Sequence, residues 1–173
     1  MKITVNKIIR YILQVIAAVL AVVIDQLIKN QAVKTLSPGK TVTLIPHILG
    51  LTYAENTGAA FSLFDQHTWL LSVFTGIALT AGLVVMFVIK ESPVIYQICL
   101  PLIIAGGAGN LYDRLTRGFV VDYIQTLFVD FPIYNFADCL ITCACFAIII
   151  YLIYDLITQS KKTGDDQGET VDD

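Results

Sequence analysis

Residues 105–138 read AGGAGNLYDRLTRGFVVDYIQTLFVDFPIYNFAD and lie between two long apolar runs of the chain. This stretch brings together six polar side chains, which are Asn110, Asp113, Arg114, Asp122, Asn135 and Asp138. An ionisable side chain at the centre of a membrane-spanning helix costs about 2.5 to 3.5 kcal/mol, so such residues are kept mainly where they have a function. The cluster is therefore the first candidate site.

The composition is that of a protein that crosses a membrane several times. Hydrophobic residues make up 56% of the 173 positions, charged residues make up 14%, and the mean hydropathy is +0.73. A soluble domain of this length could not bury so much apolar surface. The formal net charge is −3, and no basic run forms a surface for nucleic acid. We therefore expect a membrane protein with no nucleic-acid partner.

The cysteines and histidines do not suggest a metal centre. All four cysteines fall within apolar runs, without the paired spacing of metal ligands, and these are Cys99, Cys139, Cys143 and Cys145. His47 and His67 lie far from them, in a polar connection. We interpret the cysteines as small apolar packing residues, and we expect neither a metal nor a cofactor.

Four segments have the length and composition of transmembrane helices, for which a hydrocarbon core requires about 20 residues. These segments are 8–28, 69–89, 93–113 and 137–157. They predict an all-α integral membrane protein, a bundle of four helices that forms one domain over 1–160. Residues 161–173 carry five acidic residues after two lysines, and we expect them to be a disordered cytoplasmic tail.

The connection over 40–64 predicts a small β segment outside the membrane. Residues 41–45 and 50–54 are rich in Thr, Val, Leu and Ile, and Pro46 separates them. The sequence Asn56-Thr57-Gly58 follows and is typical of a turn. Asn56 has two possible roles, either as a turn residue in the left-handed conformation or as a ligand of a substrate backbone.

Four spans place both termini on one side of the membrane and bring Asn110 and Arg114 to the same side as Asp25. The basic residues expected on the side of the termini are Lys2, Lys7, Arg10, Lys90, Lys161 and Lys162. Those expected on the other side are Lys29, Lys34, Lys40, Arg114 and Arg117. Because basic residues favour the cytoplasm, this small majority predicts cytoplasmic termini and a cluster near the outer face.

The spacing within the cluster predicts a cleft with two carboxylates. Asn110 and Arg114 are four residues apart, and Asn135 and Asp138 are three apart, so each pair shares a helix face. The polar cluster has no Ser, Cys or Lys beside a histidine, which excludes the usual pairing of a nucleophile with a base. Asp122 and Asp138 remain as a pair that could share one proton, with one acting as base on a water and the other as acid.

Several of these residues also have a purely structural interpretation. Asp138 could stabilise the start of a helix, where the helix dipole would also favour its ionised form. Asp122 could be a loop carboxylate paired with Arg117. Asp25 and Lys29 are four residues apart and could form an ion pair on one helix face rather than line the cleft. These alternatives stay open at this stage.

The glycine-rich residues 106–109 also allow two interpretations. Small residues let membrane helices approach each other closely. The same residues could instead leave room for a substrate chain beside the polar cluster. The sequence does not choose between the two.

Five ordered motifs resemble those of bacterial lipoprotein signal peptidase, also called signal peptidase II. They are Asp25-Gln26-x-x-Lys29, Asn56-x-Gly58-Ala59-Ala60-Phe61-Ser62, Gly109-Asn110-x-x-Asp113-Arg114, Gly118-x-Val120-x-Asp122-Tyr123 and Tyr134-Asn135-x-Ala137-Asp138. The resemblance covers nearly the whole chain. Tyr123 and Tyr134 stand where this family often has phenylalanine, which keeps the aromatic character.

The resemblance implies an aspartic endopeptidase of the bacterial plasma membrane that cuts prolipoproteins before a cysteine bearing diacylglycerol. It implies that Asp122 and Asp138 are the catalytic pair. It also implies a supporting or substrate-binding set, which is Asp25, Lys29, Asn56, Gly58, Asn110, Arg114 and Asn135. The implied fold adds a small β cradle and a short surface helix outside the membrane. The implied partners are prolipoproteins, membrane lipid and globomycin-type inhibitors, and we expect a monomer.

A small transporter or proton-relay subunit is the alternative from another functional class, because acids near membrane helices also mark ion pathways. The expected acids gather on one side of the membrane. The span over 69–89 has no ionisable residue that could continue a pathway across it. This pattern favours the peptidase.

Overall fold

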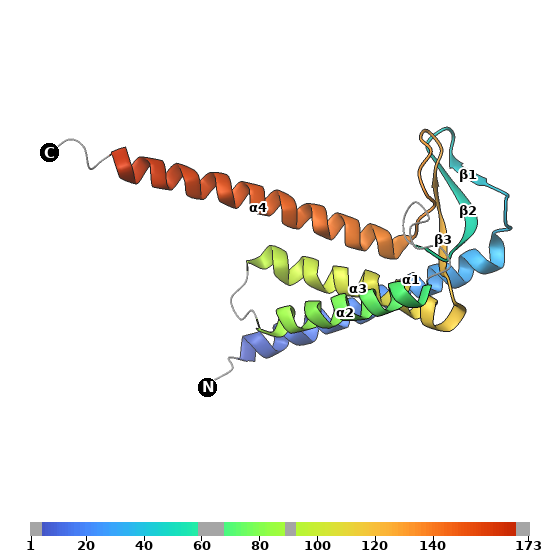
Figure 1. Ribbon diagram of the computed structural model, residues 1–173, viewed down its shortest axis with the longest axis horizontal. Helices are drawn as coiled ribbons and strands as arrows, with labels where there is room; N and C mark the ends of the chain where they lie inside the picture. Colours follow the sequence, from blue (N-terminus) through green and yellow to red (C-terminus); the bar gives the residue numbers. More distant parts are fainter. Residues whose placement is uncertain (1–4, 59–67, 89–92, 169–173) are drawn as a thin grey trace.

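The computed structural model describes residues 5–58, 68–88 and 93–168. Its long helices are α1 (Val5–Thr35), α2 (Thr68–Val88), α3 (Val94–Arg117) and α4 (Phe136–Gly168), shown in Figure 1. Each contains a segment long and apolar enough to cross a membrane, and these are Lys7–Thr35, Thr68–Val88, Val94–Arg117 and Phe136–Ser160. The prediction of four membrane-spanning helices is confirmed.

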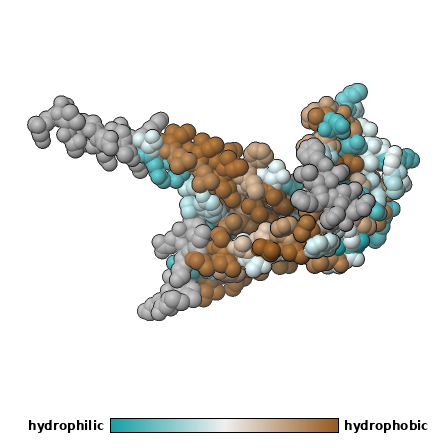
Figure 2. Space-filling view, viewed as in Figure 1, coloured by the Kyte–Doolittle hydropathy of each residue, from teal (hydrophilic) through white to brown (hydrophobic). Residues whose placement is uncertain are grey.

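The surface has the polarity of a membrane protein. Figure 2 shows hydrophobic side chains over the helices and a more hydrophilic region around the β-strands. Large apolar residues such as Leu13, Phe74 and Ile150 are exposed on α1, α2 and α4. Such a surface is stable only where lipid replaces water.

Helix α3 packs against each of the other three helices. A Cβ atom added at Gly106 would lie 2.5 Å from the carbonyl oxygen of Ala137 in α4. One added at Gly107 would lie 2.9 Å from Leu79 Cδ2 in α2, and one at Gly109 would lie 2.5 Å from Asp25 Oδ2 in α1. Each of these three glycines therefore allows a different helix to approach α3 closely. Of the two interpretations of 106–109, helix packing is the one that these contacts bear out.

A three-stranded antiparallel sheet lies at one end of the bundle, with the strand order β1-β2-β3. Strands β1 (Val42–Ile45) and β2 (Leu49–Asn56) confirm the β pair that the sequence predicted. Strand β3 (Val120–Thr126) was not predicted, because Asp122 was interpreted as part of a loop. Its β-branched and aromatic residues favour a strand, and its backbone pairs with β2, where Asp122 lies opposite Ala54. Asp122 is thus on a strand, which fixes its position more firmly than a loop would.

The connection from α3 to β3 depends on one glycine. Gly118 has a φ of 82°, and its N–H donates to the carbonyl oxygen of Arg114 at 3.2 Å. A left-handed residue at this place is a common helix ending and is easiest for glycine. The turn carries the chain into β3, where Val121 and Tyr123 pack on Ala32 near the end of α1. The sheet is thereby fixed to the helical bundle.

The structure bears on two further expectations, the disordered tail and the short surface helix. The disordered tail expected over 161–173 is wrong for residues up to Gly168, because α4 continues to that residue. A helix already formed gains one hydrogen bond for each added residue, and no proline interrupts it here. Residues 169–173 lie outside the described part. The short surface helix is not among the helices of residues 5–58, 68–88 and 93–168, and 59–67 lie outside them.

Candidate active site

Asp122 and Asp138 come from different elements and line the same pocket, whose volume is about 690 Å³. Asp122 lies on β3 and is 2% exposed, whereas Asp138 lies in the first turn of α4 and is half-buried. Asn56, Asn110 and Arg114 line the same pocket. Five of the residues singled out in the sequence therefore meet at one place.

The amide of Asn135 connects the two aspartates. The Oδ1 atom of Asn135 accepts a hydrogen bond from the backbone N–H of Asp138 at 3.1 Å, and the backbone N–H of Asn135 donates to Asp138 Oδ2 at 3.1 Å. This reciprocal pair is a capping box at the start of α4. The Asn135 Nδ2 atom donates to Asp122 Oδ1 at 2.6 Å. The start of α4 and the position of both carboxylates are thus fixed by one buried residue, which holds Asp122 through its side chain and the Asp138 carboxylate through its backbone N–H.

Asn56 holds the other oxygen of Asp122. Its Nδ2 donates to Asp122 Oδ2 at 2.9 Å, and its Oδ1 accepts from the backbone N–H of Gly58 at 3.0 Å. Among the described non-glycine residues only His47 has a positive φ, so Asn56 does not adopt the left-handed conformation. Asn56 forms the turn through its side chain, and the same side chain orients Asp122.

Asn110 links Asp138 to a buried ammonium group. Its Nδ2 donates to Asp138 Oδ1 at 2.7 Å, and its Oδ1 accepts from Lys29 Nζ at 2.8 Å. An ammonium group can only donate, so it requires the oxygen of Asn110 to face it. The amide nitrogen then necessarily faces Asp138. Lys29 therefore fixes the orientation of the Asn110 amide, with its nitrogen toward Asp138.

The Lys29 side chain is completely buried and is neutralised by two carboxylates. Its Nζ lies 2.9 Å from Asp25 Oδ2 and 3.0 Å from Asp113 Oδ2. A buried charge is stable only when it is paired and hydrogen-bonded, which this arrangement provides. The ion pair between Asp25 and Lys29 is thus confirmed. Neither residue lines the pocket with the aspartates. Lys29 connects to it through Asn110, and Asp25 Oδ1 accepts from the backbone N–H of Ala137, directly before Asp138, at 3.2 Å.

Asp113 is a member of this network that the sequence analysis left out of the supporting set. Its Oδ2 also accepts from the backbone N–H of Val121 at 3.3 Å, directly before Asp122 on β3. Arg117 Nε lies 3.3 Å from Asp113 Oδ1, so Arg117 pairs with Asp113, and the suggested pairing with Asp122 does not form. The i, i+4 spacing of Asp113 and Arg117 on a helix was the signal that could have indicated this pair.

Arg114 and Gly58 meet at the edge of the pocket. The Nη2 atom of Arg114 donates to the carbonyl oxygen of Gly58 at 3.1 Å. This bond ties the turn after β2 to α3. The guanidinium group also brings a positive charge to the pocket that holds both carboxylates.

The pKa of Asp122 is raised to about 7, mainly because the carboxyl group is buried and also because Asp138 lies nearby. The hydrogen bonds from Asn56 and Asn135 act in the opposite direction, since they stabilise the ionised form. Asp122 therefore holds a proton at mildly acidic pH and in about half of the molecules near pH 7, where an ordinary aspartate is ionised. A shifted carboxyl group in a pocket is typical of an acid catalyst.

The cysteines differ in their surroundings. All four are free, and Cys99 is buried as expected of a packing residue. Cys139 and Cys143 instead line the pocket, and Cys143 is exposed, so the packing interpretation is wrong for Cys143. They are one turn apart on α4, next to Asp138, and give this wall of the pocket a small, weakly polar surface.

Comparison with known proteins identifies the family. The family described as Signal peptidase (SPase) II matches residues 17–154, which include the whole network described above. The chain belongs to the signal peptidase II family. A solved bacterial membrane enzyme has the same fold, with a TM-score of 0.77 and 33% identity over 83% of this chain and 88% of that one.

Curated members of the signal peptidase II family are similar over most of their length. The chain is 39% identical over 142 residues to a lipoprotein signal peptidase of Latilactobacillus sakei, covering 82% of this chain and 94% of that protein. It is 38% identical over 148 residues to one of Lactococcus lactis, covering 86% and 98%. A second solved bacterial membrane enzyme gives a TM-score of 0.74 at 33% identity, covering 82% of this chain and 93% of that one.

The close approach of α1 to α3 in this family member leads to a first prediction. Gly109→Ala would place a methyl group 2.5 Å from Asp25 Oδ2 and displace the partner of Lys29. We expect it to lower the free energy of unfolding by about 1 to 3 kcal/mol, as overpacking does. Thermal unfolding in a neutral detergent measures this.

Gly82→Ala is the matched control for Gly109→Ala, because its Cβ would lie 3.4 Å from Ile104 Cγ1, an ordinary contact. It should unfold at or above the wild-type temperature, since alanine is the better helix former. Equal unfolding temperatures for Gly109→Ala and the wild type would contradict the proposed steric role.

Proposed function

We propose that the chain removes signal peptides from diacylglyceryl-modified prolipoproteins and that Asp122 and Asp138 are its catalytic pair. The observation that carries this proposal is Asn135, whose side-chain Nδ2 and backbone N–H donate to the carboxylates of Asp122 and Asp138, which line one pocket of a signal peptidase II family member. The relatives at 39% and 38% identity are lipoprotein signal peptidases, which supports the same class of substrate. The catalytic type follows from the carboxylate pair.

In the proposed mechanism Asp138 is the base and Asp122 is the acid. Asp138, half-buried and bonded to the N–H of Asn135, removes a proton from a water that attacks the scissile carbonyl carbon. Asp122, which holds a proton near neutral pH, donates it to the carbonyl oxygen as the tetrahedral intermediate forms. The intermediate then collapses, the C–N bond breaks, and the proton on Asp138 passes to the leaving amine. Asp122 regains its proton as the carbonyl re-forms.

The surrounding residues are proposed to hold this pair in its working state. The ammonium group of Lys29 orients Asn110, which donates to Asp138 and stabilises its ionised form. Asn56 holds Asp122 from the side opposite Asn135. Arg114 is well placed to orient the carbonyl groups of a bound peptide, because its guanidinium group lines the pocket. Asp25 contributes by neutralising Lys29.

The walls of the pocket suit a lipid-bearing substrate. Beyond the polar residues they are mainly apolar, with Phe128 and Val129 exposed to the surroundings. Such a surface is compatible with hydrocarbon, so we propose that the diacylglyceryl chains lie along it and enter from the membrane. Globomycin-type cyclic peptides are proposed to bind in the same pocket.

The arrangement of the chain supports a topology for this function. The beginning of α1 and the end of α4 lie away from the sheet, and the aspartates lie close to it (Figure 1). With the basic residues on the side of the termini, we propose cytoplasmic termini and an active site near the outer face. All of the proposed catalytic and supporting residues come from one chain, so we propose a monomer with one peptidase domain over 1–160. No comparison favours the transporter alternative.

Replacement of either aspartate tests the catalytic pair. We expect Asp122→Asn and Asp138→Asn each to lower cleavage of a diacylglyceryl-modified prolipoprotein by about 10³-fold or more, because the two carboxylates act as a unit. Asp130→Asn is the matched control, since Asp130 is exposed and lies between the two. It should cleave at the wild-type rate. Near-wild-type cleavage by a folded Asp122→Asn or Asp138→Asn variant would contradict the mechanism.

The raised pKa of Asp122 predicts the alkaline limb of the pH profile. Below about pH 7 Asp122 holds the proton that it must donate, and above it that proton is lost, so kcat/KM should fall about tenfold per pH unit. Asn56→Ala removes a hydrogen bond that favours the ionised form, so the alkaline limb should move to higher pH. A flat profile from pH 6 to about 9, or a shift of Asn56→Ala to lower pH, would contradict this assignment.

A further inference from the structure

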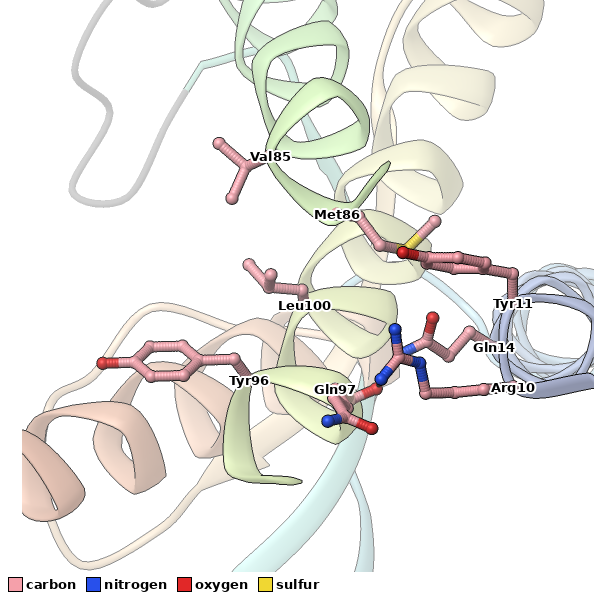
Figure 3. A pocket seen from close by; sticks show the side chains of 8 residues that line it. All are labelled: Arg10, Tyr11, Gln14, Val85, Met86, Tyr96, Gln97 and Leu100. Carbon is pink, nitrogen blue, oxygen red and sulfur yellow. The ribbon is translucent and has the colours of Figure 1, made fainter. Parts of the chain in front are cut away.

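Polar side chains mark two levels along the helical bundle, about one membrane thickness apart. At one end Arg10 and Gln14 lie together beside a cavity of only about 10 Å³, which has room for about one water (Figure 3). At the other end Lys29 bonds to Asn110, which bonds to Asp138. Arg10 and Lys29 are about 28 Å apart along α1, and the hydrocarbon core of a bilayer is about 30 Å thick. Asp138 therefore lies close to one boundary of the hydrocarbon.

One end of the β-sheet carries a group of exposed apolar side chains, which we call the sheet tip. Its members are 47% to 70% exposed, and they are Leu44, Ile45 and Ile48 around the turn from β1 to β2, with Phe128 and Val129 after β3. The two parts of the tip are joined, because the backbone N–H of Leu127 donates to the carbonyl oxygen of Ile48 at 2.9 Å. Neighbouring exposed apolar residues of this kind indicate a surface that is covered by something other than water.

The sheet tip lies near the level of the first turns of α4. Phe128 and Val129 line the same pocket as Asp138. Figure 1 shows the strands running across the direction of the helices, with the tip on the side of the bundle where α4 lies and the start of β1 near the end of α1. Because Asp138 lies close to the boundary of the hydrocarbon, the tip is within reach of the same boundary.

The sheet tip is also continuous with the surface of α4 that lies in lipid. Cys143 is exposed and lines the pocket together with Phe128. Phe146 and Ile150 follow Cys143 on the same face of α4 and are 61% and 66% exposed. An apolar surface thus extends from the middle of α4 across the pocket to the tip. Lipid that covers α4 can therefore cover the tip without a break, whereas a soluble protein would reach the tip alone.

We propose that the sheet tip inserts into the leaflet nearest the aspartates and anchors the sheet to the bilayer. The partner is phospholipid, at the level where the headgroups meet the acyl chains. Insertion is shallow, about 5 to 10 Å, because the exposed Asp130 directly follows Val129 and has to stay among the headgroups. Strand β3 joins Asp122 to the tip, so the anchor also holds Asp122 at a fixed depth. This interaction goes beyond the proposed function and does not depend on it.

The test measures quenching of tryptophan fluorescence by brominated lipid in vesicles that contain the full chain. The sequence has one tryptophan, so Trp69→Phe gives a background without any. Ile48→Trp in this background is the deciding probe, because Ile48 is exposed and is not among the described residues that line the pocket. Phosphatidylcholine brominated near the ester end of its acyl chains should lower its emission by about twofold or more, and bromine near the terminal methyl groups should lower it less. Unchanged emission with both lipids would overturn the proposal.

Ile45→Trp is a second probe from the same turn, which serves if Ile48→Trp does not fold, and it should show the same loss. Phe128→Trp should also be quenched. Quenching of Phe128→Trp alone would overturn the proposal, because Phe128 lines the pocket and lipid within the pocket would explain it. A tip that is covered by a second copy of the chain would give emission from Ile48→Trp that bromine does not change, which is again the contradicting result.

Lys40→Trp is the matched control, because Lys40 is exposed and precedes β1 at the end of that strand away from the tip. Its emission should change little with either brominated lipid. A loss equal to that of Ile48→Trp would overturn the proposal, since it would indicate quenching over the whole sheet. No readout involves proteolysis, so failure of the anchor and failure of the proposed function are distinguishable.

Discussion

The buried amide of Asn135 is the interaction on which the arrangement of the site depends. Its Oδ1 accepts from the backbone N–H of Asp138 in the first turn of α4, and its Nδ2 donates to Asp122 on β3 and to Asn110 Oδ1 on α3 at 3.2 Å. Three elements that are distant in the sequence therefore meet at one group with three polar partners. An amide is suited to this place because it donates and accepts without adding a charge to a site that already contains two carboxylates.

The buried ion network of Lys29, Asp25 and Asp113 supports the arrangement around this amide. Lys29 is neutralised by Asp25 and Asp113, and the same ammonium group orients Asn110 toward Asp138. These bonds require α1 and α3 to lie in close contact, which Gly109 permits by leaving no side chain against Asp25. The close packing of α1 on α3 and the positions of the buried charges therefore depend on each other. A residue larger than Gly109 would displace Asp25 and Lys29, and through Lys29 and Asn110 it would disturb the position of Asp138.

The sequence was sufficient to predict the parts with strong local signals. Four predominantly apolar runs of about 20 residues indicated four spans, and the Thr- and Val-rich residues around Pro46 indicated the β pair. Strand β3 was missed because its residues lie among charged and turn-forming neighbours, and because its pairing with β2 is a contact across more than 60 residues. Asp113 was recognised in the polar cluster but left out of the supporting set for a related reason. Its role depends on Val121 and Lys29, which only the folded chain brings to it.

The most direct test of this account is the cleavage rate of Asn135→Ser. Serine caps helices about as well as asparagine, so α4 should begin normally and thermal unfolding should change little. Serine has no amide nitrogen to donate to Asp122 Oδ1, which Asn135 holds at 2.6 Å. The account predicts a stable protein whose kcat/KM on a diacylglyceryl-modified prolipoprotein falls by about 10² or more, comparable to removal of a general acid or base. Cleavage by a folded Asn135→Ser variant at nearly the wild-type rate would contradict it.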